Sequence, residues 1–464
     1  MNLLPKLKQE IKGFSLWFRI VCVVMAVVYL SLWIFTIHLS YIQKSKGIEP
    51  TLPGAPKDSI GYILISESII NGNGLSQNGR IETLRGFAYP LFAAIIKTLG
   101  HSYFAVTLVQ IILVFASAFI IRRIGIVFSG RKVGEVAATL FLLNPVSMTL
   151  ALFILTDVLF LFLFVLGFYL AVTIDQKKPF RRIFIVSIIF ALAIYTRGMG
   201  IFALPIFMAP VLAAKVPFKL QAKLGGFIAV FIIFSTIPAI VRNYVRTGIP
   251  AFNGFESTNL SWIVPKFLAN ANGTKEVDET INFQKATGVP DSSWQDLSAY
   301  DLRYSSQISK AGEKIILERP FSYLKFHIVT SIPFLFPSSI LFMRDAYDSA
   351  NAVKRPFKYG VINALAKGDW KSFYDGVLEV WWKFAERVLW LFGLILGVVA
   401  AWKDRRNPLV WVFVFVSAYF MLLSGPAAGP RLSFQAWPYM FLLFASGGIC
   451  VLQRLSGFFS KKGL

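Results

Sequence analysis

Charged residues are scarce in this sequence, and their scarcity excludes an ordinary soluble domain. Only 15% of the 464 residues are Asp, Glu, Lys or Arg, whereas 56% are hydrophobic, and the mean hydropathy is +0.63. Soluble domains typically carry about 25% charged residues. We therefore expect a polytopic membrane protein.

Cysteine and histidine are scarce as well, which excludes two kinds of site. The two cysteines, Cys22 and Cys450, both lie inside apolar runs, so they provide neither a disulfide framework nor a cysteine-built metal site. The three histidines, His38, His101 and His327, are far apart along the chain, which does not favour a histidine-built metal centre.

Basic residues outnumber acidic ones, but their distribution does not fit a nucleic-acid-binding protein. The 47 Lys and Arg residues against 24 Asp and Glu residues give a formal net charge of +23. A nucleic-acid binder gathers its basic residues in one patch or stripe. Here they lie between long apolar runs, so nucleic acid is not expected as a partner.

Ten apolar segments approach the length of about 20 residues that a membrane-spanning helix needs. The first is not a cleaved signal peptide, because its apolar stretch is long and aromatic and no small-residue cleavage site follows it. Together the segments predict an all-α polytopic transmembrane bundle of about 10–13 spans. They cover residues 16–38, 103–121, 134–151, 153–174, 183–197, 200–214, 225–242, 387–402, 408–424 and 436–453.

The short loops between these segments fall into two classes, and the difference predicts the topology. One class is nearly uncharged and lies around residues 144–148, 198–200 and 425–430. The other class is rich in Lys and Arg, so the positive-inside rule places it and both termini in the cytoplasm. The basic class consists of 1–13, 122–132, 176–182, 215–223, 403–406 and the C-terminal tail.

Two long stretches, 39–102 and 243–386, then face the non-cytoplasmic side as the first and second external regions of a single domain that covers 1–464. Between the cytoplasmic loops 215–223 and 403–406 the number of crossings must be even, but the segment 325–343 makes it three. It contains two prolines, so we expect it to be re-entrant or interfacial. A further crossing within 356–386 is the alternative.

Two short helices are expected in the first external region. Residues 58–72 place apolar side chains on one helical face, and Gly72 ends the pattern, as in a helix that lies flat on a membrane surface. Residues 87–100 form a second apolar piece that is too short to span. The charged residues between them suit an amphiphilic substrate with an anionic head. The apolar face contains Ile60, Ile63, Leu64, Ile69 and Ile70, and the charged residues are Arg80, Glu82 and Arg85.

The second external region mixes polar and aromatic side chains. Segments 276–288 and 296–318 are amphipathic and predict short helices over the bundle. Aromatic residues beside Asn or Asp are typical of sugar recognition, and the other interpretation is an interfacial aromatic belt. The basic stretch 344–386 is expected to lie along anionic headgroups.

Several short motifs follow one another in a fixed order along most of the chain. The first external region contains Asp58-x-x-x-Tyr62, then Asn71-Gly72-Asn73-Gly74-Leu75, then Arg85-Gly86-Phe87-Ala88-Tyr89-Pro90-Leu91-Phe92. Later motifs are Leu155-Thr156-Asp157-Val158-Leu159-Phe160, Tyr195-Thr196-Arg197, Arg242-Asn243-Tyr244, Asn259-Leu260 and Gly429-Pro430-Arg431-Leu432. Together they resemble the family 39-like membrane glycosyltransferases, which include the protein O-mannosyltransferases and the lipid A aminoarabinose transferases and have the GT-C fold. Two features depart from the family pattern: Asp157 stands where Glu is usual, and the aromatic residue between two arginines is missing near Arg431.

The resemblance implies an enzyme that takes a sugar from a polyprenyl-phosphate donor and transfers it to a hydroxyl of a lipid, glycan or protein. It implies a multi-pass protein of a bacterial inner or plasma membrane with its active site outside the cytoplasm. A single inverting displacement requires one carboxylate to accept the proton of the attacking hydroxyl. It also requires fixed cations for the leaving phosphate, and arginine fits phosphate oxygens in bidentate geometry.

Asp58 is the candidate base, because it is the acidic residue that matches the family's position in the first external region. The alternative is a helix N-cap, where a carboxylate binds free backbone N–H groups. Arg85 is the first candidate for the donor phosphate, and the alternative is an arginine that snorkels to the interface. Glu67, on the same expected helix as Asp58, is expected to be solvated.

Arg197 and Arg431 are further candidates for the donor phosphate. Each is the charged residue of an otherwise neutral external turn, and charge at such depth marks a functional site by default. The alternative for both is a structural ion pair, for example with Asp157, which itself either pairs or takes part in the site. Arg242 is weaker, because arginines at the end of a span often anchor the headgroup region.

Substrate positioning is expected from Tyr62, Glu82, Tyr89, Asp157 and Asn259. The second carboxylate raises the question of a divalent metal. No residue spacing typical of metal ligands is present, so no metal site is predicted and a divalent metal is left open.

Two other functions compete with the transferase. A transporter or flippase of lipid-linked sugars would bind phosphate through the same arginines without chemistry, but it should place its charges at mid-membrane in interrupted helices. An O-antigen-ligase-like or polymerase-like enzyme would carry its key residues in a late loop. The stretch from Asp58 to Tyr89 would then be unexplained.

Overall fold

The computed structural model describes residues 13–45, 57–175, 177–198, 200–295, 300–350 and 368–461. These residues form helices, apart from loops and one hairpin of two-residue strands, β1 (Ser76–Gln77) and β2 (Arg80–Ile81). The expected all-α polytopic bundle is therefore confirmed, and the chain is a multi-pass integral membrane protein.

Seven helices among the described residues are long and apolar enough to cross a membrane. Each coincides with one of the segments expected from the sequence. They are α2 (Leu16–Ser45), α5 (Tyr103–Ser129), α9 (Pro179–Thr196), α11 (Phe218–Thr247), α19 (Trp370–Lys403), α20 (Pro408–Ser424) and α22 (Trp437–Lys461).

The other three expected spans are broken or short. The run 134–151 is divided into α6 (Arg131–Leu143) and α7 (Pro145–Ala151), which meet at 61° because Asn144 caps a new helix that begins at Pro145. Helix α8 (Asp157–Val172) has 16 residues, and α10 (Leu204–Leu212), which follows the 3-10 turn η1 (Gly200–Ala203), has nine. The described residues thus contain seven candidate spans, or nine if each bent pair counts as one, instead of the 10–13 expected.

The proline-containing segment 325–343 forms a bent pair, as its sequence indicated. Helix α16 (Pro320–Ser331) continues into η3 (Ile332–Phe334), and α17 (Ser339–Ala350) leaves at 82°. No further crossing begins between 370 and 386, because these described residues are the first part of α19. The remainder of that stretch, 351–367, lies outside the described residues.

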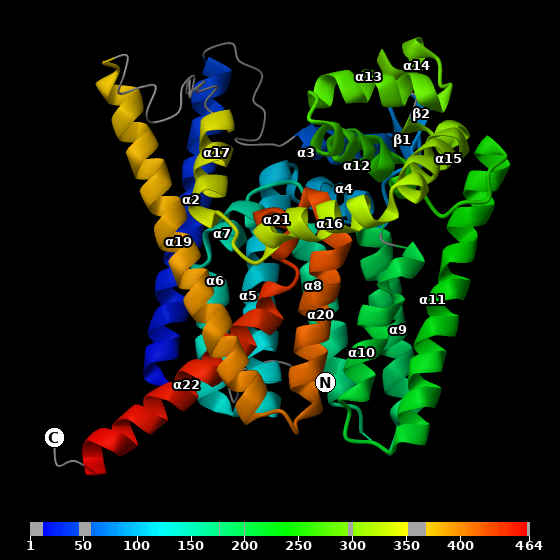
Figure 1. Cartoon of the computed structure of the whole chain (residues 1–464). Helices are drawn as coiled ribbons and strands as arrows, with labels where there is room; N and C mark the ends of the chain where they lie inside the picture. The colour runs from blue at the N-terminus through cyan, green and yellow to red at the C-terminus, as the bar shows by residue number, and fades with distance from the viewer. Residues whose placement is uncertain are drawn as a thin grey trace.

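Both ends of the described chain lie at one end of the bundle. Figure 1 shows α2 beginning and α22 ending there, together with the connections α5–α6, α10–α11 and α19–α20 that the sequence marked as basic. The short helices of the first and second external regions lie at the opposite end (Figure 1). They are α3 (Lys57–Ile70), α4 (Ala88–Gly100), α12 (Phe255–Asn272), α13 (Glu276–Thr287), α14 (Asp291–Gln295) and α15 (Leu302–Glu318).

Helix α3 packs through a face that the apolar pattern did not indicate. Its most buried side chains include Ser59, Tyr62 and Ile65, whereas Ile60 is 45% exposed. Ser66 is buried too, and its hydroxyl donates to Pro90 O of α4 at 3.1 Å. Small and aromatic residues thus dock α3 on α4, and the isoleucine-rich face is left more open.

Aromatic rings and glycines hold the bundle together. The ring of Phe164 on α8 contacts those of Phe190, Phe207 and Phe420 on three other helices. Helices α5 and α6 touch backbone to backbone, since a Cβ on Gly134 would lie 2.3 Å from Arg122 O. Such close approach between membrane helices requires small residues.

We predict that Gly134→Ala destabilises the protein, because its methyl group would meet the fixed backbone of α5. Overpacking of this kind costs about 1–3 kcal/mol. Thermal unfolding in detergent should show a lower Tm than for the matched control Gly226→Ala, whose Cβ meets nothing within 4 Å. Equal Tm values for the two variants would contradict this packing.

Candidate active site

Four charged side chains join in one series, which we call the ion-pair chain. Asp157 Oδ1 accepts from Arg197 Nη1 at 2.6 Å, and Asp157 Oδ2 accepts from Arg431 Nε at 3.0 Å. Arg431 continues through Nη1 to Asp58 Oδ2 at 2.6 Å. The structure thus brings together the candidate base, two of the candidate phosphate arginines and the second carboxylate.

Each member of the ion-pair chain sits at the end of a different element. Asp58 lies in the first turn of α3, and Asp157 is the first residue of α8. Arg197 follows the last residue of α9, and Arg431 belongs to α21 (Pro430–Ser433), a short turn after η4 (Gly425–Ala427). Segments separated by up to 373 positions therefore meet at one point of the fold.

The four members of the ion-pair chain differ widely in exposure. The side chain of Asp157 is fully buried, those of Arg197 and Arg431 are 16% and 28% exposed, and that of Asp58 is 53% exposed. Gln435 Nε2 adds a third donor to Asp157 at 3.3 Å. Asp157 therefore fixes the two arginines, and Asp58 is the carboxylate that a substrate can reach.

The charges of the ion-pair chain balance, and Arg431 lies between its two acids. Burial lowers the pKa of Arg431, but the carboxylates of Asp157 and Asp58 outweigh burial and raise its pKa above the usual value. The guanidinium is consequently charged at every pH at which the protein is folded. The ion-pair interpretation of Arg197 and Arg431 is confirmed by these contacts, which also leave both arginines partly exposed.

Arg85 lies beside the next turn of α3. Its guanidinium is 5.3 Å from the ring centroid of Tyr62 and 3.2 Å from Glu82 Oε2. It approaches α3 at Gly61, where a Cβ would lie 2.7 Å from Arg85 Cζ. Residues three and four apart lie on one helix face, so Arg85 is placed about one turn from Asp58. Its side chain is 17% exposed and is held by these contacts.

Glu82 and Tyr62 support this arrangement. Glu82 Oε1 accepts from the backbone N of Leu84 at 2.7 Å and of Arg85 at 2.8 Å, so it shapes the turn that carries Arg85. Burial raises the pKa of the Tyr62 phenol, which also feels the charges of Arg85 and Arg431. Tyr62 is therefore a neutral side chain that contacts Arg85 and lies near Arg431.

Three other residues form no hydrogen bond or ion pair with the ion-pair chain among the described contacts. Tyr89 is fully buried, and its hydroxyl donates to Gln110 Oε1 at 2.8 Å, so it packs beneath Tyr62. Asn259 is exposed on α12, and no hydrogen bond or ion pair among the described residues joins it to the ion-pair chain. Glu67 binds Lys97 of α4 at 3.1 Å, and its side chain is still 35% exposed.

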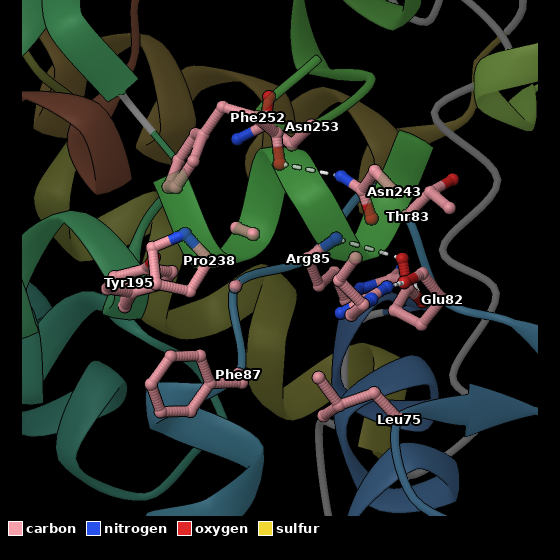
Figure 2. A pocket seen from close by; sticks show the side chains of 13 residues that line it. Leu75, Glu82, Thr83, Arg85, Phe87, Tyr195, Pro238, Asn243, Phe252 and Asn253 are labelled. Atoms are coloured by element: carbon pink, nitrogen blue, oxygen red, sulfur yellow. Dashed lines mark hydrogen bonds and ion pairs between the residues drawn. The ribbon is translucent and has the colours of Figure 1, made fainter. Parts of the chain in front are cut away.

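A cavity of about 180 Å³ lies beside Arg85. Figure 2 shows Arg85 and Glu82 on one side of it and Tyr195 and Pro238 on the other. It lies where the first external region meets the ends of α9 and α11. Its lining is formed by Leu75, Glu82, Thr83, Arg85, Gly86, Phe87, Tyr195, Pro238, Ala239, Arg242, Asn243, Phe252 and Asn253.

Two contacts fasten the first external region to the second at this cavity. Arg242 Nη2 donates to Glu82 O, and the backbone N of Gly254 donates to Thr83 O at 3.1 Å. Gly86 packs so closely on α9 that a Cβ would lie 2.0 Å from Tyr195 O. From the sequence, Arg242 is only a weak candidate and Asn243 is not a candidate, although the motif Arg242-Asn243-Tyr244 contains both.

The residues that the structure describes contain no group of three or more His, Cys, Asp or Glu side chains that could hold a metal ion. The two carboxylates of the ion-pair chain face arginines instead. Arginine supplies the positive charge that these two carboxylates contact.

Comparison with known proteins finds a structural likeness and no sequence relative. No family model matches the sequence, and no curated protein matches it. The chain is similar to the crystal structure of ArnT from Cupriavidus metallidurans bound to undecaprenyl phosphate, with a TM-score of 0.39 and 14% sequence identity. The match covers 94% of this chain and 78% of that chain. Because the likeness is this distant, the proposals below rest on the residues of the chain itself.

We predict that Asp157→Asn lowers stability strongly, because Arg197 and Arg431 would lose a fully buried counter-charge. Removing one partner of a buried ion pair costs about 3–5 kcal/mol. The matched control is Asp301→Asn, which breaks an exposed pair with Arg303 and should cost about 1 kcal/mol or less. Unfolding followed in detergent tests the difference, and similar losses for both variants would contradict the anchoring role of Asp157.

Proposed function

We propose that this protein is a glycosyltransferase that moves a sugar from a polyprenyl-phosphate donor to a hydroxyl of a lipid, glycan or protein. The observation that carries the proposal is the ion-pair chain, which joins a half-exposed carboxylate to two arginines at one end of a membrane bundle. Transfer to a hydroxyl needs a base and fixed cations at the leaving phosphate. The ion-pair chain and Arg85 supply both.

Asp58 acts as the base in this proposal. It contacts Arg431 at 2.6 Å on one side, and its 53% exposed side chain leaves another side open to an acceptor. The acceptor oxygen attacks the anomeric carbon while its proton passes to Asp58. The bond between that carbon and the phosphate oxygen breaks, and polyprenyl phosphate leaves with the electron pair. One displacement inverts the anomeric configuration.

The arginines hold the leaving phosphate. The hydrogen bonds recorded for Arg431 engage its Nε and Nη1, so its Nη2 group can donate to a phosphate oxygen. The Arg85 guanidinium is held in place by the ring of Tyr62 and the carboxylate of Glu82. A guanidinium that is already oriented loses little freedom on binding an anion, which favours a stable contact with the departing group.

The membrane arrangement supports a lipid-linked donor. The ion-pair chain is built from α3, α21 and the ends of α8 and α9, and Figure 1 shows α3 and α21 away from the end where α2 begins and α22 ends. By the positive-inside rule that end faces the cytoplasm, so the site opens on the other side. Both termini are cytoplasmic in this topology.

The same geometry argues against the competing functions. A transporter of lipid-linked sugars would need charges at mid-membrane in interrupted helices, whereas these charges gather at element ends. A ligase-like enzyme with its site in a late loop would leave Asp58 unengaged, whereas Asp58 binds Arg431 directly. A transferase explains the exposed carboxylate, which neither alternative requires.

We predict that Asp58→Asn abolishes transfer and leaves donor binding intact. Loss of a general base lowers kcat by about 10²–10⁴-fold, whereas Arg85, Arg197 and Arg431 remain to bind phosphate. The measurement incubates purified protein with radiolabelled polyprenyl-phosphate sugars and candidate acceptors, with Asp301→Asn as the matched control. Transfer by the Asp58 variant at the wild-type rate would remove Asp58 from the base role.

We predict that Gly61→Ala weakens donor binding without changing any charge. The added methyl group would occupy the space of the Arg85 guanidinium, whose flexible side chain must swing away. The Kd for polyprenyl phosphate should rise about as much as in Arg85→Ala, whereas Gly226→Ala should bind like the wild type. If Gly61→Ala and the wild type bind equally, the observed position of Arg85 has no role in recognition.

A further inference from the structure

Asn243 carries a buried acceptor whose partner is missing. The residue is 2% exposed, and its Nδ2 donates to the carbonyl oxygens of Ala251 and Phe252, each at 2.9 Å. Its Oδ1 has no hydrogen-bond partner among the described residues. Flipping the amide would turn Oδ1 towards two carbonyl oxygens, so this orientation is the favourable one. A buried acceptor without a donor is unfavourable and indicates a site where a donor arrives from outside the chain.

Asn243 forms part of the lining of the cavity of about 180 Å³, so a ligand bound there lies next to this side chain. Figure 2 shows Asn243 beside Thr83 and above Glu82, on the side of the cavity that carries the charged residues. One water needs about 10–15 Å³ of such space, so the cavity has room for a ligand of at least the size of a monosaccharide ring.

The other side of the cavity is aromatic. The rings of Phe87 and Tyr195 have centroids 4.6 Å apart, and those of Tyr195 and Phe252 have centroids 5.3 Å apart. Flat apolar surfaces of this kind pack against the C–H faces of a sugar ring. The cavity therefore offers one apolar wall and one hydrogen-bonding wall to the same ligand.

The charges around the cavity decide which donor can meet Asn243. Arg85 and Arg242 contribute two positive charges and Glu82 one negative charge, and Glu82 already binds Arg85. An ammonium group would be repelled by the excess positive charge. A neutral hydroxyl on a ligand that also carries an anionic group satisfies both Asn243 and the arginines.

We propose that this cavity binds the sugar of the donor, and that Asn243 selects a neutral sugar by accepting a hydrogen bond from one of its hydroxyls. The proposal rests on the proposed function for the identity of the ligand as a glycosyl phosphate. Asn243 is then a specificity-determining residue, and amino sugars with an ammonium at that position are excluded.

The test measures binding of farnesyl-phosphate glucose, mannose and galactose and of their monodeoxy analogues to the full-length protein in nanodiscs. For a sugar that binds, removal of one particular hydroxyl should raise Kd at least about tenfold. Replacing that hydroxyl with an ammonium should raise Kd at least as much. Equal Kd values for the parent sugar and all its deoxy analogues, or no binding by any of these sugars, would overturn the proposal.

Two variants assign the effect to Asn243. In Asn243→Ala the parent sugar and the critical deoxy analogue should bind with similar Kd, because the acceptor that distinguishes them is gone. Asn253→Ala is the matched control: it lines the same cavity, but its Nδ2 donates to Gly198 O and its Oδ1 accepts from Phe255 N. The control should keep the wild-type ratio of Kd values, and a ratio unchanged in Asn243→Ala would overturn the proposal.

The readouts separate this proposal from the proposed function. Kd values do not depend on turnover, so the wild-type deoxy series decides the role of the cavity even if an Asn243 variant fails to fold. Binding that depends on one hydroxyl, in a protein that never transfers the sugar, would support the cavity assignment and reject the transferase. Transfer of the sugar with Kd values that do not depend on any hydroxyl would support the transferase and reject the cavity assignment.

Discussion

The buried carboxylate of Asp157 is the constraint on which the rest of the site depends. A fully buried charge must be compensated, because the apolar core of the bundle cannot solvate it. Arg197 and Arg431 provide the compensation from the end of α9 and from α21. Arg431 in turn holds Asp58. One buried acid thus fixes the relative positions of four segments that the loops alone would leave free.

This arrangement gives two chemically identical side chains different tasks. Asp157 is surrounded by donors from Arg197, Arg431 and Gln435, so it has no face left for a substrate. Asp58 is bound on one side only and is half-exposed. In the proposed mechanism the first is structural and electrostatic, and the second handles the proton. Arg431 contacts both carboxylates, so a phosphate that binds Arg431 acts on both of them electrostatically.

The sequence predicted those features of the fold and of the candidate site that depend on local composition. Hydropathy located the seven long helices, and neutral turns containing one arginine pointed to Arg197 and Arg431. It did not reveal the break at Pro145, because the apolar run continues across it, or the packed face of α3, because tertiary contacts with α4 decide it. The cavity was not foreseeable, since residues from the first external region, α9, α11 and the start of the second external region form it together.

A structure of the protein with a non-transferable polyprenyl-phosphate sugar tests the central claim most directly. The account predicts a phosphate oxygen within hydrogen-bond distance of Arg431 and Arg85. It places the sugar over Tyr195 and the Asp58 carboxylate opposite the bond to phosphate. A donor phosphate bound elsewhere, with the pair of Asp58 and Arg431 undisturbed and remote from the anomeric carbon, would contradict it.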